Sequence, residues 1–286
     1  MRAKHILLPT DFSSNARNAI AYAISLFENE ECVFYVLNAF EVGASGLSST
    51  MGKAKKTRLY RAIKEESEFN TTALVAKLKH KNQNPIHEFK SLSIPDSLLN
   101  AIGKTVIDNN ISYVFMGTKG SSAVKEVFMG SNTVSVIKHI DFCRLVAVPE
   151  NYSFVSPEQI AFATNFEHVS SKVELNPLID LAKLCDSEII IVHVDMGKNL
   201  TSQQQTCKNI LMKRLDGLPH RFEEVEGASK ISDAIQSYIS ENKDIGMIAM
   251  ANYWHSFFER LTKENVINRI VFDTEVPFLI FPLIDP

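Results

Sequence analysis

The sequence has little cysteine, no excess of positive charge and no long hydrophobic run. No apolar segment approaches the roughly 20 residues of a bilayer-spanning helix, so we expect no membrane partner. The four cysteines form no C-x-x-C pair and the eight histidines form no H-E-x-x-H motif, which excludes the common zinc-site and dithiol patterns. The formal net charge of −3 provides no general attraction for nucleic acid, so we expect none as a partner.

What the sequence does contain is the composition of a folded protein that is long enough for two domains. Its 286 residues are 45% hydrophobic and 22% charged, and a single domain commonly spans about 100–200 residues. The first nine residues lack the apolar stretch and the small-residue cleavage site of a secretory signal. We therefore expect a cytoplasmic protein.

The two halves of the chain resemble each other in sequence, which predicts a tandem repeat. Three segments of the first half, 4–12, 112–117 and 145–149, parallel the segments 158–166, 246–251 and 278–282 of the second. The connecting segment 150–157 is short and contains one proline. We predict one domain over residues 1–150 and a second over 151–286, packed side by side.

Each half alternates short apolar runs with longer segments of helical period, a pattern typical of βαβ units and a parallel sheet. In the first half we expect strands at 5–9, 32–39, 86–92, 113–117 and 144–149, and helices at 14–27, 58–81, 95–108 and 133–139. In the second half we expect strands at 160–164, 189–194, 221–225, 247–251 and 278–281, and helices at 171–185, 203–215, 231–240 and 257–272. The predicted fold class is α/β, with two tandem Rossmann-like domains, each a five-stranded parallel sheet flanked by four helices.

The candidate site lies where the first and fourth strands of the first half end, because open parallel sheets bind ligands beyond these ends. The first strand ends in Pro9-Thr10-Asp11, and the fourth ends in Met116-Gly117. Gly117, Gly120 and Gly130-Ser131 follow a G-x2-G-x9-G-S pattern that leads into the last helix. Glycine lets backbone amides approach an anion, and a helix start adds unpaired N–H donors. The pattern predicts a phosphate-binding site.

With these motifs the sequence resembles the universal stress protein family, in particular its tandem two-domain members. The resemblance covers almost the whole chain and implies the adenine nucleotide alpha-hydrolase-like variant of the Rossmann-like fold. It implies that Gly117 and Gly120 flank the ribose and phosphates of ATP, and that Gly130, Ser131 and Asn132 hold phosphate oxygens. Magnesium normally accompanies ATP.

The resemblance also implies roles at the other strand ends. Asp11, which follows Pro9 and Thr10, would lie at the ribose and adenine end of the nucleotide, and Asn38 would contact adenine through its backbone. Lys119 lies between two glycines, where its charge could neutralise phosphate; only its position supports this role. The family pairs its domains through the last strand, which implies an intrachain pseudo-dimer with 144–149 against 278–281. A homodimer of whole chains is also open.

Each motif residue also has a purely structural interpretation. Gly117 and Gly120 could be turn residues after a strand. Asp11 could form an Asx turn or cap a helix, and Ser131 could cap the last helix through the same amides that would bind phosphate. The joint spacing of the motif favours phosphate binding.

The second half departs from the motif at every one of these places. Asn165 replaces Asp11, Ala251 replaces Gly117, Trp254 replaces Gly120, and Lys263-Glu264 roughly replace Gly130-Ser131. The halves also differ in charge: residues 1–150 hold 18 Lys and Arg against 14 Asp and Glu, and residues 151–286 hold 12 against 19. We expect one nucleotide site, in the more basic first half.

The residues and the resemblance leave three functions open. The first is a stress-response or regulatory module that binds ATP without efficient turnover. The second is a slow ATPase, although the sequence has no Walker G-x4-G-K-[ST] motif and no base paired with a nucleophile. The third is a scaffold, or a protein that binds a small apolar ligand through its second half.

Overall fold

The computed structural model describes most of the chain. The described residues are 3–41, 58–118, 131–139, 143–168, 171–197, 199–228, 230–252, 267, 270 and 274–282.

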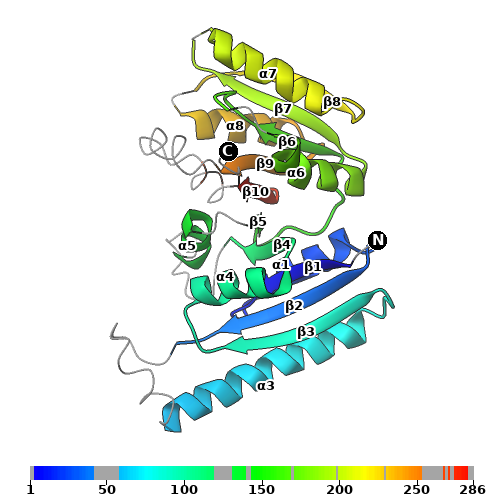
Figure 1. Cartoon of the computed structure of the whole chain (residues 1–286), viewed down its shortest axis with the longest axis vertical. Helices are drawn as coiled ribbons and strands as arrows, with labels where there is room; N and C mark the ends of the chain where they lie inside the picture. Colours follow the sequence, from blue (N-terminus) through cyan, green and yellow to red (C-terminus); the bar gives the residue numbers. More distant parts are fainter. Residues whose placement is uncertain are drawn as a thin grey trace.

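Ten strands form one continuous sheet in the order β3-β2-β1-β4-β5-β10-β9-β6-β7-β8 (Figure 1). Within each half all neighbouring strands are parallel, as predicted. The strands are β1 (Lys4–Pro9), β2 (Cys32–Ala39), β3 (His87–Ile94), β4 (Tyr113–Gly117), β5 (Arg144–Val148), β6 (Gln159–Ala163), β7 (Glu188–Asp195), β8 (His220–Glu226), β9 (Ile245–Asn252) and β10 (Phe278–Pro282).

The helices connect these strands as crossovers. They are α1 (Ser14–Leu26), α3 (Arg58–Lys81), α4 (Leu98–Asn109), α5 (Ser131–His139), α6 (Lys172–Cys185), α7 (Ser202–Arg214) and α8 (Ile231–Glu241). All of these helices and strands lie within three residues of their predicted ends. The predicted helix 257–272 falls outside the described residues except for Ile267 and Ile270, which are helical and buried.

Local sequence signals explain where several helices begin. The Ser13 hydroxyl accepts a hydrogen bond from the Ala16 amide at the start of α1. Ser171 and Thr201 begin α6 and α7 with capping boxes, in which the cap side chain and the side chain three residues later satisfy each other's backbone amides. These caps supply partners for amides that a helix leaves unpaired.

Alternate side chains of each strand enter two apolar layers, one on each face of the sheet. The layer under α1, α3, α6 and α7 includes Ile6, Phe34, Phe115, Phe162 and Ile191. The layer under α4, α5 and α8 includes Leu7, Tyr35, Val114, Ala161 and Ile190. Both layers run through both halves, so the two halves share the core on each face of the sheet.

The halves meet where β5 and β10 pair antiparallel, with Phe278 opposite Ala147 and Ile280 opposite Leu145. These are the two strands that we expected to pair. Each predicted five-stranded sheet is therefore half of a single larger sheet. Pairing between β5 and β10 leaves neither strand as an exposed edge.

The connecting segment is anchored to both halves. Asn18 on α1 donates to the carbonyl oxygens of Pro149 and Tyr152 at 2.9 and 3.1 Å. The Tyr152 hydroxyl donates to the Gly246 carbonyl at 3.4 Å in the second half, and the rings of Tyr152 and Phe154 meet Tyr22 edge to face.

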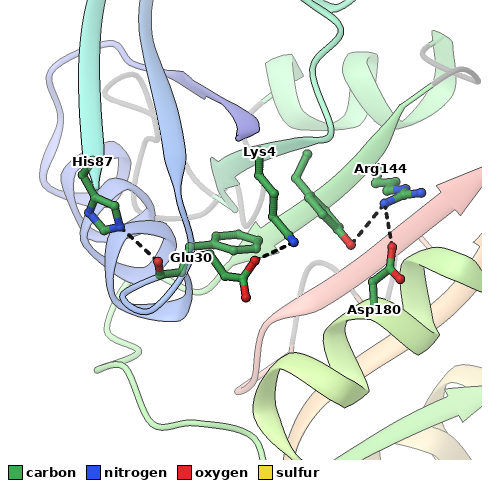
Figure 2. A network of polar contacts seen from close by, with 7 residues as sticks. Lys4, Glu30, His87, Arg144 and Asp180 are labelled. Carbon is green, nitrogen blue, oxygen red and sulfur yellow. Dashed lines mark hydrogen bonds and ion pairs between the residues drawn. The ribbon is translucent and has the colours of Figure 1, made fainter. Parts of the chain in front are cut away.

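A polar contact also crosses the junction between β5 and α6. Figure 2 shows Arg144 facing Asp180, with an N–O distance of 3.4 Å. The Arg144 guanidinium also lies 5.1 Å from the centre of the Tyr113 ring, and the Tyr113 hydroxyl donates to the Pro177 carbonyl. Burial raises the pKa of Tyr113 to about 12, and the positive charge of Arg144 offsets part of this rise.

Candidate functional site

In the first half, the candidate site predicted from the sequence lies at the carboxyl ends of β1 and β4, where the strand order reverses. The chain leaves β1 for β2 on one side and later returns to β4 on the other, so the strand order reverses between these two strands (Figure 1). Ligands of open α/β sheets bind in the crevice outside such a switch point.

Three residues after β1 form a tight turn into α1. Thr10 is buried, and its hydroxyl accepts the Phe12 amide at 2.9 Å. The Asp11 carboxylate is exposed and accepts the Ser13 amide at 3.0 Å, the Asx turn that the sequence left open. Phe12 adopts a left-handed φ of 63°, a strained conformation that persists where surrounding bonds fix it. Pro9, the last residue of β1, is buried.

Asn38, near the end of β2, is held by its side chain. Its amide nitrogen donates to the Thr10 carbonyl at 2.7 Å. Its amide oxygen accepts the Ser67 hydroxyl at 2.7 Å, and the Ser67 and Ser93 oxygens are 2.6 Å apart. From the sequence we expected only a backbone role for Asn38. Neither serine was predicted, because nothing in the local sequence around Ser67 and Ser93 links them to the site.

Gly117, at the end of β4, lies directly against Asn15 of α1. A Cβ atom at position 117 would lie 2.5 Å from the Asn15 Oδ1 atom and 2.6 Å from its Cγ atom. Asn15 is itself buried, so a larger residue would displace a side chain in the first turn of α1. The close approach of β4 to α1 therefore requires glycine here. Met116, the residue before it, is buried in the layer under α4 and α5.

Helix α5 begins at Ser131 and is tied back to β4. The Thr133 hydroxyl donates to the Gly117 carbonyl at 2.9 Å, a contact that the sequence did not predict. Asn132 is exposed in the same turn. Lys119, Gly120 and Gly130 lie outside the described residues. The structure thus brings together the first turn of α1, Gly117 and the start of α5.

The second half repeats the turn with different chemistry around it. Phe166 has a φ of 57°, its amide donates to the Thr164 hydroxyl, and the Glu167 amide donates to Asn165. A ring nitrogen of His193 lies 3.1 Å from the Thr164 carbonyl, the place that Asn38 takes in the first half.

Side chains from neighbouring elements pack against this second turn. Phe166 is buried and packs on the rings of His193 and Phe222. The Lys208 ammonium lies 3.2 Å from the centre of the Phe222 ring, and Gln204 donates to the Asn165 carbonyl at 2.9 Å. Ala251 stands at the position of Gly117. Trp254, Lys263 and Glu264 lie outside the described residues.

Two further observations concern metal ions and membranes. Within the described ranges, no group of three or more His, Cys, Asp and Glu side chains is placed to hold a metal ion. The described helices include none that is long and apolar enough to cross a membrane.

Comparison with known proteins identifies relatives for the first half. Residues 2–148 match a family model described as the Universal stress protein family. Over 146 residues the chain is 27% identical to a universal stress protein of Methanocaldococcus jannaschii, an alignment that covers 47% of this chain and 88% of that protein.

Solved structures resemble the chain over nearly its whole length. A universal stress protein from Archaeoglobus fulgidus DSM 4304 matches with a TM-score of 0.71 and 16% identity over 99% of each chain. A functionally unknown protein from Pseudomonas aeruginosa PAO1 matches with a TM-score of 0.62 and 10% identity, over 98% of this chain and 93% of that one. At these identities the likeness shows that the whole tandem fold is shared.

Proposed function

The chain belongs to the universal stress protein family, and we propose that its first half is a domain that binds ATP beyond the ends of β1 and β4. One observation carries the proposal: at the switch point of the sheet Gly117 lies against Asn15, in the first turn of α1 that follows Thr10–Phe12, and Thr133 fixes the start of α5 beside Gly117. Such a helix start offers unpaired amides and a favourable dipole to phosphate.

In this proposal each part of the site meets one part of the nucleotide. Asp11, with Pro9 and Thr10, lies at the ribose and adenine end, and the end of β2 near Asn38 faces adenine. Gly117, which follows Met116 at the end of β4, and Gly120 flank the ribose and phosphates. Phosphate oxygens meet the amides of Gly130, Ser131 and Asn132. Lys119 supplies positive charge.

Magnesium would arrive with the nucleotide. The described residues hold no ready-made group of metal ligands, and magnesium in nucleotide sites commonly keeps several waters and binds phosphates with one or two carboxylates. The ion would screen phosphate charge.

We further propose that residues 1–150 and 151–286 are two domains of an intrachain pseudo-dimer, joined at β5 and β10, and that only the first binds nucleotide. The module serves a cytoplasmic stress response in which nucleotide occupancy, rather than turnover, is the signal. Whole chains could pair further as a homodimer, which light scattering would measure.

The test is to identify what the protein binds. Mass spectrometry of nucleotides released from freshly purified protein should find an adenine nucleotide, and calorimetry with ATP, ADP, AMP and cyclic AMP should rank them. We expect saturable ATP binding that strengthens when magnesium is added. Absence of binding by all four at millimolar concentration would overturn the proposal.

A further inference from the structure

A chain of four polar groups connects helix α3 to the β1–α1 turn. Ser67 lies midway along α3, and only 5% of its surface is exposed. Its hydroxyl donates to Asn38, which donates to the Thr10 carbonyl, both at 2.7 Å. Ser93 on β3 lies 2.6 Å from Ser67. We call these four residues the polar relay.

The directions of these hydrogen bonds are fixed by chemistry. A carbonyl only accepts, so Asn38 must present its NH₂ group to Thr10 and its oxygen to Ser67. Ser67 then donates its single proton to Asn38, so Ser93 must be the donor in the last contact. Removing the Ser67 hydroxyl would leave a half-buried amide oxygen without this partner and would weaken the hold on the Asn38 orientation.

The Thr10 carbonyl belongs to the turn that carries Asp11 and Phe12. The relay fixes this turn from the β2 side, while Thr10 and Asp11 fix it from within. We infer that Asn38 and Ser67 are positioning residues of the nucleotide site, through which α3 sets the geometry of the Thr10–Phe12 turn. The nucleotide part of this inference rests on the proposed function, and the structural part does not.

The second half supports the structural part of the inference. There a ring nitrogen of His193 lies 3.1 Å from the Thr164 carbonyl oxygen. Gln204 on α7 donates to the Asn165 carbonyl. In both halves, side chains therefore connect this turn to the neighbouring strand (β2 or β7) and to the helix that follows that strand (α3 or α7). The side chains that make these contacts differ between the halves. The shared element is a donor on the threonine carbonyl.

Three variants of the full chain test the relay. Ser67→Ala removes the donor to Asn38. Asn38→Asp keeps an acceptor for Ser67 but removes the donor to Thr10 and places negative charge beside its carbonyl. Asn38→His restores a donor of the kind that His193 provides. The matched control is Thr71→Val, which removes another buried α3 hydroxyl, one that donates within the helix to the Ser67 carbonyl.

The readouts are ATP affinity by calorimetry, melting temperature, and amide hydrogen exchange at Phe12 and Ser13. We expect ATP to bind about three- to tenfold more weakly to Ser67→Ala and at least about tenfold more weakly to Asn38→Asp. Thr71→Val should stay within about threefold of the unmodified chain, and Asn38→His should bind ATP more tightly than Asn38→Asp. Exchange at Phe12 and Ser13 should be faster in the first two variants only.

The outcomes separate this inference from the proposed function. If the unmodified chain binds no ATP, the nucleotide proposal fails, and the exchange data alone decide whether the relay holds the turn. If the chain binds ATP but Ser67→Ala changes neither ATP affinity nor amide exchange at the turn, the inference that the polar relay positions the turn is wrong. Equal losses in Ser67→Ala and Thr71→Val would also overturn it, because they would reflect general damage to α3.

Discussion

Thr133 donates its hydroxyl to the carbonyl of Gly117 at 2.9 Å, so the first turn of α5 is bound to the end of β4. The bond places a helix start beside the strand end at which the sheet reverses its order. Phosphate binding needs this placement, because helix amides act only on anions close to the first turn.

Replacing Thr133 by valine should loosen this helix start. Valine keeps the branched shape but cannot donate, so the Gly117 carbonyl loses its side-chain partner. We expect the free energy of unfolding to fall by about 1 kcal/mol and ATP to bind several-fold more weakly. Urea unfolding and calorimetry measure the two effects. The control Thr133→Ser keeps the hydroxyl, and equal ATP affinities for the valine and serine variants would contradict the prediction.

Substitution of Gly117 should have two separable effects. It should lower the stability of the fold, and it should weaken ATP binding. Gly117→Ala places a Cβ atom against Asn15, an overpacking that typically costs about 1–3 kcal/mol. The double variant Gly117→Ala/Asn15→Ala makes room for the new methyl group and should recover part of this stability. ATP binding should remain weak in the double variant if the ligand needs bare backbone at 117. Full recovery of affinity would show that Gly117 serves packing alone.

How well the sequence predicts a feature depends on how far apart in the chain the residues that form it lie. Strands such as Ile189-Ile190-Ile191 and helices with clear caps were placed within a few residues, since their patterns are local. The relay was not predictable, because Ser67 and Asn38 are 29 residues apart and meet only after β2 and α3 pack. Thr133 was missed for the same reason: its partner, Gly117, is 16 residues away. The roles of Lys119, Gly120 and Gly130 stay predictions.

Alkaline pH should weaken the junction between the halves. Burial raises the pKa of Tyr113 to about 12, above the ordinary value near 10 that an unfolded chain would show. The folded state therefore favours the neutral phenol, and this contribution is complete below pH 10 and is lost as pH rises from 10 through 12. The loss from Tyr113 is on the order of 2–3 kcal/mol.

Urea unfolding between pH 8 and 11.5 measures this loss, and Tyr113→Phe isolates its source. Burial also raises the pKa of Tyr22, so both proteins should lose stability in this range. The variant should start lower at pH 8, because it lacks the bond to the Pro177 carbonyl, and should then lose less. Parallel curves for the two proteins would contradict the assignment to Tyr113.

ATP turnover should be far below the roughly 10 per second typical of enzymes. The sequence has no Walker G-x4-G-K-[ST] motif and shows no base paired with a nucleophile. Phosphate release from purified protein, measured with and without magnesium, is the test. Turnover near the enzyme rate that disappears in the Gly117→Ala/Asn15→Ala variant would favour an ATPase instead.

One nucleotide should bind per chain, because the second half keeps the fold of the site but not its surface. The Thr164–Phe166 turn repeats the backbone geometry of Thr10–Phe12, so folding alone does not separate the halves. Around it, Phe166 is buried against Phe222, and Gln204 takes the Asn165 carbonyl. Ala251 replaces Gly117, and the sequence adds Trp254 and Glu264 where the first half has Gly120 and Ser131.

These differences add bulk and negative charge where triphosphate would need open backbone and positive potential. A single reversal such as Ala251→Gly or Trp254→Gly should therefore not create a second site. Calorimetric titration with ATP should saturate at one nucleotide per chain, for the unmodified protein and for both variants. Loss of all binding in Gly117→Val, in a variant that circular dichroism shows to be folded, would place that one nucleotide in the first half. A stoichiometry of two in the unmodified chain would show that backbone geometry, which both halves share, is sufficient for binding.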